Sequence, residues 1–275
     1  MNQFLHLNLR DDFGLKLGLT KIALEARLKE CSNVLTLGVY PNFSDYNKDE
    51  LQLINEAEKI YYPTLFYSDI FTAMGKPIFP SLHTYLFAQD KIKQTALFNL
   101  LSIPHPRTRV FYGERQKKKI LEYFQFPFIA KIPKGSAMGR GVYLINSEND
   151  LLEYLCLAKN AYIQEYLKID RDIRVVIIGK KVALAYFRIA PKGEFRTNVA
   201  VGGSISFDKV PDKAIDIALY TAQKCNWNDV GIDICCYDNN YYIFEANMKY
   251  GKEGFRQAGI NYINFMESLI ETGQI

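Results

Sequence analysis

Hydrophobic and polar positions follow two different periods along this chain, and the changes between them predict its secondary structure. In the first part of the chain, helical spacing over residues 15–30 and over "KDELQLINEAEKI" is interrupted by the strand-like runs "NVLTLGVY" and "IYYPTLFY". Helices that alternate with short apolar strands indicate a layered α/β arrangement. We therefore expect a small α/β domain over residues 1–88.

The remaining residues, 89–275, contain more strand-like runs than helical ones. The helical run "DKIKQTALFNLLSI" is stopped by Pro104 and Pro106, and another helix begins after Ser147, a candidate N-cap. The strand-like runs are "FPFIAKI", "GVYLI", "AYIQEYL", "DIRVVIIG" and "KVALAYFRI", and the helical "DKAIDIALYTAQKCN" follows them. This part of the chain is expected to be α+β, with mostly antiparallel connections.

The segment "VGIDICCYDNNYYIFEANMKYG", residues 230–251, has the pattern of a β-hairpin with turn residues at its centre. A three-residue loop over 238–240 sets Asp233 opposite Glu245, whereas a two-residue loop sets it opposite Ala246. The three-residue loop is favoured because it gathers apolar side chains on one face. These side chains are Ile232, Ile234, Cys236, Tyr242, Phe244 and Ala246.

The other face of this hairpin gathers Asp233, Glu245 and Asn247. Two directly opposed carboxylates, with Cβ atoms about 4.5–5.5 Å apart, repel each other, so we expect positive charge near them. Two carboxylates and one amide form an all-oxygen donor set that suits Mg²⁺ or Mn²⁺, with water and phosphate oxygens completing the coordination. An exposed polar face with acids placed by chance is the alternative that the pattern leaves open.

The composition is that of an ordinary globular protein, with 275 residues, 48% hydrophobic positions and a net charge of +4. So small a charge calls for neither nucleic acid nor a membrane as partner. Five cysteines without a Cys-x-x-Cys spacing argue against a zinc site and a disulfide framework. No uncharged run reaches the ~18 residues of a membrane span and no leader-like pattern is seen, so we expect a cytoplasmic protein.

Two stretches have an interpretation that the sequence leaves open. The basic run "ERQKKK", residues 114–119, is either the solvated start of a helix or a docking patch for an acidic partner. The glycine-rich "KIPKGSAMGRG" is either a flap over a nucleotide or a β-hairpin turn, because glycine lets backbone N–H groups approach a phosphate closely. It is not a Walker A loop, since no Gly-Lys-Ser/Thr ends it. In the flap interpretation Lys131 reaches a phosphate.

The run "RIAPKGEFRTNVAVGG" brings Arg188, Arg196 and Asn198 close together along the chain. Two guanidinium groups near the acidic hairpin would suit a phosphate-like oxyanion. Surface arginines paired with Glu194 or Asp208 are the alternative.

Further upstream, "QEYLKIDRDIR" contributes Glu165 and Asp172, which are candidates to bind a ribose hydroxyl pair or, alternatively, helix caps or surface acids. The histidines share no spacing with one another or with a nucleophile, so no histidine-dependent catalysis is expected. They are His6, His83 and His105.

Taken in order, these stretches resemble the ATP-grasp superfamily, and within it the RimK-like amino-acid ligases, from about residue 90 to residue 251. The most specific matches are "QEY" and "DIR", then "FRTN" with the "GG" after it, and then "GID" with the "E-x-N" of the hairpin. The resemblance implies an ATP-grasp fold, in which two α+β subdomains of about 89–160 and 161–275 clasp ATP. A small α/β pre-grasp domain precedes it, and a homo-oligomer is typical of the superfamily.

The resemblance also implies a role for each matched residue. Asp233, Glu245 and Asn247 would hold one or two Mg²⁺ ions between the nucleotide phosphates. The implied nucleotide-binding residues are Lys91, Lys131, Gly135, Ser136, Gly139, Gln164, Glu165, Tyr166, Asp172 and Arg174. Among them Glu165 would sit at the adenine and Asp172 near the ribose. The implied catalytic residues are Arg188, Arg196 and Asn198.

The implied reaction is an ATP-dependent ligation through an acyl phosphate that adds glutamate or a similar amino acid to an amine- or carboxylate-bearing acceptor. A ligase of a small metabolite and a non-catalytic nucleotide-binding module are the rival interpretations. The sequence departs from the family in a longer glycine loop and a shorter link between "QEY" and "DIR". Lys249 and Tyr250 also stand where the family usually has a serine and a proline, which could reshape the site for the amino acid or the acceptor.

Overall fold

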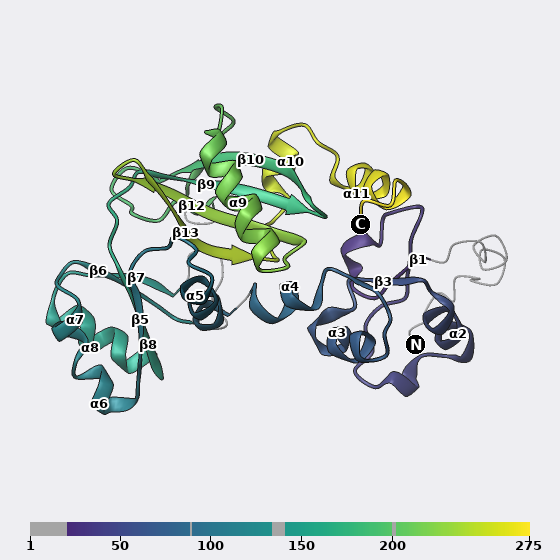
Figure 1. Ribbon diagram of the computed structural model, residues 1–275, viewed down its shortest axis with the longest axis horizontal. Helices are drawn as coiled ribbons and strands as arrows, with labels where there is room; N and C mark the ends of the chain where they lie inside the picture. The colour runs from purple at the N-terminus through teal and green to yellow at the C-terminus, as the bar shows by residue number, and fades with distance from the viewer. Residues whose placement is uncertain (1–20, 89, 134–140, 200–201) are drawn as a thin grey trace, which may run out of the picture. The chain divides into compact units, whose positions relative to one another are not determined.

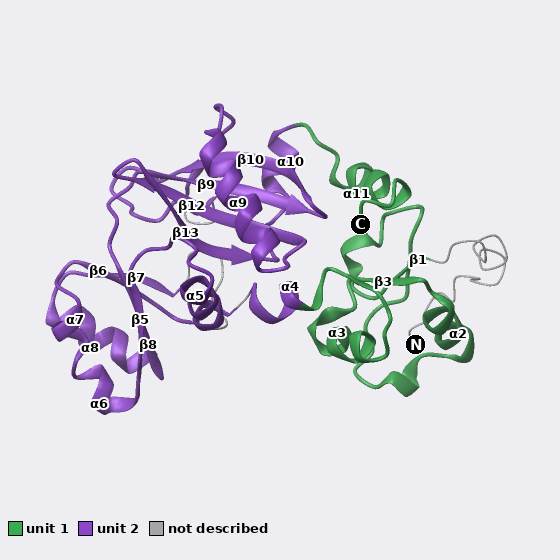
Figure 2. Cartoon of the chain, in the orientation of Figure 1, with its two compact units in different colours: residues 1–82, 259–275 green, residues 83–258 purple. Residues whose placement is uncertain are grey.

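The computed structural model describes residues 21–88, 90–133, 141–199 and 202–275 (Figure 1). These residues form two compact units, one of residues up to 82 together with 259–275, and one of residues 83–258 (Figure 2). The sequence placed a boundary near residue 88 and assigned the C-terminal segment to the second domain, whereas this segment groups with the first unit. Within the described ranges, every helix is too short or too polar to cross a lipid bilayer.

The first unit is built on a parallel sheet of strand order β2-β1-β3-β4. Its strands are β1 (Lys21–Ala23), β2 (Leu35–Thr36), β3 (Lys59–Tyr61) and β4 (Ile78–Phe79). Its helical segments are η1 (Ala26–Leu28), η2 (Phe43–Asp45), α2 (Lys48–Glu56), α3 (Thr64–Ala73) and α11 (Tyr262–Glu271). Ile22, Ile54, Ile60 and Phe71 form the centre of its core. The α/β layer that the sequence predicted in this part of the chain is therefore present.

Two local predictions in this unit are wrong. The helix expected over residues 15–30 contains the central strand β1 in its described part. A strand with neighbours on both sides and helices against the sheet is apolar at successive positions, so its pattern can be mistaken for a buried helix. The strand expected over "IYYPTLFY" ends at Tyr61, because Pro63 provides the N-cap position from which α3 begins.

The second unit begins with a small antiparallel sheet of order β5-β8-β6-β7. Its strands are β5 (Thr108–Tyr112), β6 (Phe128–Lys131), β7 (Val142–Ile145) and β8 (Asn160–Glu165). The accompanying helices are α4 (Leu82–Phe87), α5 (Lys91–Leu100), α6 (Gly113–Lys117), α7 (Ile120–Tyr123) and α8 (Glu148–Leu157). Ser147 caps α8 as predicted, with Asp150 completing a capping box. Phe111, Phe128 and Tyr154 lie at the centre of the core between this sheet and its helices.

A larger antiparallel sheet of order β11-β10-β9-β12-β13 completes the second unit. Its strands are β9 (Arg171–Ile178), β10 (Lys181–Ile189), β11 (Ser204–Ser206), β12 (Asp229–Tyr237) and β13 (Asn240–Asn247), and its helices are α9 (Asp212–Lys224) and α10 (Glu253–Gln257). Helix α9 crosses one face of the sheet and packs against four of its strands (Figure 1). Along β9, Ile173, Val175 and Ile177 join that apolar core. Since strand side chains alternate, Asp172 and Arg174 point to the opposite face.

The acidic hairpin pairs Asp233 with Glu245, as the sequence predicted, but by a different route. The turn contains only Asp238 and Asn239, both with positive φ, so the expected three-residue loop is wrong. A β-bulge at Phe244 adds the extra residue that restores the Asp233 register.

The bulge also changes which side chains face the core. Ile243, rather than Phe244, joins Ile232 and Ile234 there, and its N–H donates to the carbonyl of Pro104 (2.9 Å). Phe244 turns instead to the polar face of the hairpin, where it lines a pocket. The expected placement of Tyr242 and Phe244 on the apolar face is therefore wrong, and Tyr241 and Ile243 lie there instead.

Candidate functional site

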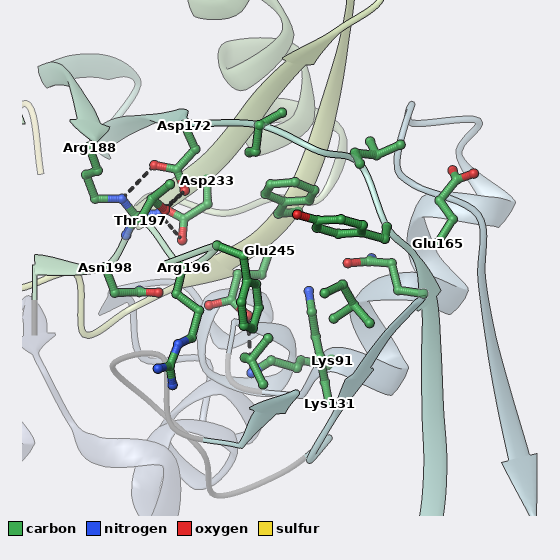
Figure 3. A pocket seen from close by; sticks show the side chains of 18 residues that line it. Lys91, Lys131, Glu165, Asp172, Arg188, Arg196, Thr197, Asn198, Asp233 and Glu245 are labelled. Carbon is green, nitrogen blue, oxygen red and sulfur yellow. Dashed lines mark hydrogen bonds and ion pairs between the residues drawn. The ribbon is translucent and has the colours of Figure 1, made fainter. Parts of the chain in front are cut away.

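The polar face of the large sheet and the open end of the small sheet line a pocket within the second unit (Figure 3). Many of the residues singled out in the sequence line it: Lys91, Lys131, Gln164, Glu165, Tyr166, Asp172, Arg188, Arg196, Asn198, Asp233 and Glu245. Glu165 lies at one end of the pocket in this view, Arg188 and Asn198 at the other, and Lys91 and Lys131 between them. Residues that are as much as 154 positions apart in the sequence, Lys91 and Glu245, thus meet in one site.

Lys91, Lys131 and Glu245 form the central cluster of the pocket. The ammonium of Lys91 lies 3.2 Å from Glu245 Oε2, and Asn247 Nδ2 donates to Glu245 Oε1 (2.7 Å). Burial alone would raise the pKa of Glu245, but the charges of Lys91 and Lys131 and the hydrogen bond from Asn247 outweigh it and lower the pKa to about 2. Glu245 is therefore an anion at any physiological pH.

Lys131 ends strand β6 and is buried beside the ring of Phe244. Burial lowers the pKa of Lys131, Glu245 opposes the change and the neighbouring Lys91 adds to it, so that the pKa is about 8. In the described part of the chain, no carboxylate forms a direct ion pair with Lys131. A polyanion entering the pocket would favour the charged form of Lys131.

Local sequence explains how Lys91 reaches Glu245. Asp90 caps α5 by accepting from the N–H groups of Ile92 and Lys93 (both 3.1 Å), so the helix begins at Lys91. One turn later, Gln94 donates to the carbonyl of Ala246 (2.8 Å) and accepts from its N–H (2.9 Å). Gln94 thereby binds the outer edge of β13 as a neighbouring strand would, and it fixes α5 beside Glu245.

A second charged cluster surrounds Asp233 on the large sheet. Arg174 donates to both of its carboxylate oxygens (2.6 and 2.7 Å), and Arg188 lies 3.0 Å from Oδ2. Arg188 also binds Asp172 in a bidentate pair (2.8 and 2.5 Å), to which Thr197 adds a hydroxyl bond (2.7 Å). The positive charge predicted beside the opposed carboxylates is thus supplied by arginines at Asp233 and by lysines at Glu245.

Arg174 is itself held from behind by the segment that follows the hairpin. Its Nη1 donates to the carbonyl of Tyr250 (3.1 Å), whose hydroxyl donates to the buried Asp229 (2.7 Å). Tyr250 packs so closely on Gly231 that a Cβ at that glycine would lie 2.5 Å from the Cβ of Tyr250. Tyr250 therefore lies behind the charged cluster, and Lys249 is exposed.

Arg196 and Asn198 lie on the loop between β10 and β11. Arg196 pairs with Glu194 (2.6 Å), as the alternative interpretation expected, and it is 30% exposed, so it keeps access to the pocket. This pairing lowers the pKa of Glu194 to about 2. The loop is held by Gly203, where a Cβ would overlap the carbonyl oxygen of Thr197.

The far end of the pocket is formed where β8 leaves the small sheet. Gln164 is buried and donates to Thr108 Oγ1 (3.0 Å). The carboxylate of Glu165, which also lines the pocket, accepts from the backbone N–H of Arg107 (2.5 Å). Gly135, Ser136 and Gly139 lie outside the described residues.

Sequence reasoning missed the apolar wall of the pocket. It consists of Ile129, Val142, Leu167, Ile169, Phe195 and Phe244, and Thr197 was also missed as the third partner of Asp172. Ile129 could have been found from its position two residues before Lys131 on one strand, since such residues share a face. Phe244 could not, because the bulge is invisible in the pattern.

The predicted metal ligands are two carboxylates and one amide, those of Asp233, Glu245 and Asn247. Carboxylate and amide oxygens are suitable donors for Mg²⁺, which also retains water and phosphate oxygens. A carboxylate offers about four lone-pair positions, and three of those on Asp233 are taken by arginines, so one remains. Glu245 lines the pocket and Asn247 is hydrogen-bonded to it, so the residues fit a hydrated cation. In the described part of the chain, no cluster of three His, Cys, Asp or Glu residues offers a closed metal cage.

The fold of the chain is that of the ATP-grasp proteins. The D-alanine–D-alanine ligase of Bacillus anthracis, solved with ATP, superposes with a TM-score of 0.67 at 14% identity over 92% of this chain and 96% of that one. A RimK domain ATP-grasp protein of Sphaerobacter thermophilus gives a TM-score of 0.66 at 12% identity over 90% and 98%. Residues 88–270 match the model of the RimK-like ATP-grasp domain, and the chain belongs to that family.

Curated relatives share this region of the chain. The coenzyme gamma-F420-2:alpha-L-glutamate ligase of Methanococcus maripaludis is 31% identical over 192 residues, which are 66% of this chain and 65% of that protein. A probable alpha-L-glutamate ligase of Nitrosococcus oceani is 33% identical over 178 residues, 62% of this chain and 59% of that protein. The chain thus spans less than two thirds of the length of these relatives. The fold class and the family expected from the motifs are confirmed.

Proposed function

We propose that this protein is an ATP-dependent ligase that joins a carboxylate to an amine through an acyl phosphate. The observation that carries the proposal is the pocket of a RimK-like ATP-grasp domain in which Lys91, Lys131 and Glu245 meet Arg188 and Arg196. Such a set of cations around a carboxylate suits a polyphosphate with its counter-ion. We take the apolar wall to receive the base of the nucleotide.

Each charged group has a part in the proposed reaction. Lys91 and Lys131 bind the nucleotide phosphates and align the terminal phosphoryl group. That group passes to an oxygen of the substrate carboxylate, and ADP leaves. An amine then attacks the acyl carbon, the acyl C–O bond breaks, phosphate departs and the nitrogen loses a proton. Arg196 and Asn198 offset the negative charge that develops on the transferred phosphate.

In the proposal, the arginines beside Asp233 hold its carboxylate in place. Arg188 is buried between Asp172 and Asp233, and both carboxylates raise its pKa against the effect of burial, so its charge is permanent. In the proposal, a divalent cation is held by Glu245, Asn247 and the remaining position of Asp233. When bound, it supplies Lewis-acid neutralisation of phosphate charge.

The names of the relatives suggest the substrate class. One is named an alpha-L-glutamate ligase and the other a probable one, and we propose glutamate or a similar amino acid as the added group. The acceptor would carry an amine or a carboxylate, on a small molecule, a peptide or a protein tail. A cytoplasmic location and a homo-oligomeric state stay predictions of the sequence.

The test is release of ADP from Mg·ATP by the purified protein across a panel of amino acids and acceptors, with Glu245→Gln measured beside it. We expect one combination to raise turnover, and Glu245→Gln to reduce it by about two orders of magnitude or more. Glu153→Gln serves as the control, because Glu153 is exposed on α8 and is not among the residues that line the pocket. ATP binding without turnover in any combination, or equal activity of Glu245→Gln, would contradict the proposal.

A further inference from the structure

A group of exposed basic side chains lies on the small-sheet part of the second unit, and the proposed chemistry does not use it. We call it the basic edge, and its members are Arg107, Arg109, Arg115, Lys118 and Lys119. The segment 107–119 holds six basic residues and one acidic residue, a net charge of +5, whereas the whole chain carries +4. The net positive charge of this protein is therefore concentrated in one short segment.

The basic edge and the basic run 114–119 of the sequence do not have the same members. Lys117 is buried and binds Glu114 (3.0 Å), so it belongs to the packing of α6. The guanidinium of Arg109 lies 3.8 Å from the ring centre of Tyr123, and that of Arg107 lies 4.6 Å from the ring centre of Phe124. Stacking on aromatic rings limits the motion of both arginines, which lowers the entropy lost when they bind a partner.

Arg107 and Arg109 lie along an open strand edge. Strand β5 is the outermost strand of its sheet, and in the described part of the chain no strand pairs with its other side. Because Glu165 N–H donates to the Arg107 carbonyl across the Thr108–Gln164 pair, that pair is a non-hydrogen-bonded one. The backbone N–H and C=O groups of Thr108 and Val110 therefore point away from β8, toward the open edge.

We propose that the basic edge docks an acidic, extended polypeptide segment, which adds to β5 as a further strand. The proposal rests on the proposed function, since the docked polypeptide would be the acceptor or would carry it. Main-chain hydrogen bonds to Thr108 and Val110 supply affinity, as in other cases of strand addition. Arg107, directly before β5, and Arg109, within it, are two positions apart and share one face, so acidic side chains at every second position of the partner lie opposite them.

The place of the edge suits an acceptor. Arg107 begins this edge, and its backbone N–H binds the carboxylate of Glu165, a residue that lines the pocket. A segment bound along β5 therefore lies one hydrogen bond away from the wall of the proposed active site. RNA would meet the same charges, but it has no main-chain groups at the spacing that the strand edge offers, so the geometry favours polypeptide.

The charge is tested by fluorescence anisotropy with a labelled peptide of about ten residues in which glutamate and threonine alternate. The variant is Arg115→Glu/Lys118→Glu/Lys119→Glu. The control is Lys180→Glu/Lys209→Glu/Lys213→Glu, which makes the same change in charge on exposed lysines of the large-sheet part. We expect the variant to bind about tenfold or more weakly and the control to change by less than about threefold. Equal losses in both would overturn the proposal.

The strand geometry is tested with a second peptide of the same charge in which proline replaces threonine. Proline cannot donate a main-chain hydrogen bond, so we expect about tenfold weaker binding. Equal binding of the proline peptide, or equal or tighter binding of an RNA oligonucleotide of matched charge, overturns the proposal. So does absence of binding to the unaltered protein, in which case the arginines only protect the edge from pairing.

Two controls keep this proposal apart from the proposed ligase activity. Binding is measured without nucleotide, so a protein that is not a ligase can still bind the peptide. Release of ADP with free amino acids is measured without the peptide, so a ligase with no docking surface is also recognised. Circular dichroism and ATP binding equal to those of the unaltered protein establish that the charge-reversed variants are folded.

Discussion

Charged side chains in the pocket are arranged so that each carboxylate of the hairpin lies beside cations. Asp233 and Glu245 are directly opposed, yet arginines hold the first and lysines the second. A removed partner would leave an uncompensated charge in a region with little water, which costs far more than an exposed pair contributes. The consequences of single substitutions here should therefore depend on burial more than on chemical type.

The first prediction concerns the pH dependence of nucleotide affinity. The pKa of Lys131 is lowered to about 8 in the free protein, so the ammonium is charged at neutral pH and neutral well above pH 8. Phosphate favours the charged form and raises the pKa on binding. We therefore expect the dissociation constant for ATP to be constant near pH 7 and to rise by up to about tenfold per pH unit above about pH 8.

Isothermal titration calorimetry between about pH 7 and about pH 9.5 measures this effect, because the phosphates of ATP are already fully ionised over most of that range. Lys131→Met is the control. Its affinity should be weaker and should lack the rise that belongs to Lys131. A constant affinity of the unaltered protein over the whole range would contradict the assignment of the lowered pKa to the nucleotide site.

The second prediction compares two arginines of different burial. Arg188→Leu leaves the buried Asp172 and Asp233 without their shared partner, so the free energy of unfolding should fall by about 3–5 kcal/mol. Arg171→Leu removes an exposed pair with Asp170 and should cost about 1 kcal/mol or less. Urea denaturation measures both, and similar losses for the two variants would show that burial does not decide the effect.

At the scale of elements, the active face depends on irregularities in otherwise regular structure. The hairpin needs both a two-residue turn and a bulge to bring Glu245 opposite Asp233. The loop that carries Arg196 and Asn198 has little regular structure and is fixed by the close approach of Gly203 to Thr197. These features position the side chains of the site, and a misplacement of about 1 Å can slow a reaction about a hundredfold.

The third prediction tests this loop. Gly203→Ala adds a Cβ that overlaps the Thr197 carbonyl, so the loop must shift together with Arg196 and Asn198. We expect kcat to fall by about ten- to a hundredfold, while the affinity for ATP changes by less than about threefold. Gly193→Ala is the matched control, since nothing lies within 4 Å of its Cβ position and only its positive φ is strained. If both variants lost kcat equally, backbone strain would explain the loss, and displacement of the loop by the new Cβ would not.

At the scale of the whole molecule, the C-terminal segment belongs to the unit that opens the chain. Asn33 Nδ2 donates to the carbonyl of Glu267 (3.0 Å) and to the carboxylate of Glu271 (3.3 Å), and Ser32 also binds Glu267. Tyr61 reaches the carbonyl of Ile275 (3.1 Å). A parallel sheet of such short strands has little core of its own, so helix α11 is expected to contribute much of its stability.

The fourth prediction follows from these bonds. Asn33→Ala should lower the free energy of unfolding of the first unit by about 1–3 kcal/mol, because Asn33 is 9% exposed and its loss removes the hydrogen bonds to the Glu267 carbonyl and the Glu271 carboxylate. Thermal denaturation followed by circular dichroism measures the loss, and ATP affinity should stay unchanged since the pocket lies in the second unit. A loss of ATP affinity as large as that of Lys131→Met would contradict the separation.

The sequence by itself determined the family, the layered α/β and α+β classes and most of the polar residues of the pocket. It could do so because motifs such as "DIR", "FRTN" and "E-x-N" are local, and because the period of apolar positions reports which face of a strand is buried. It could not determine the bulge at Phe244, the strand β1 inside a helix-like run, or the return of residues 259–275 to the first unit. Each of these depends on which distant surface covers the segment, and only the tertiary structure decides that.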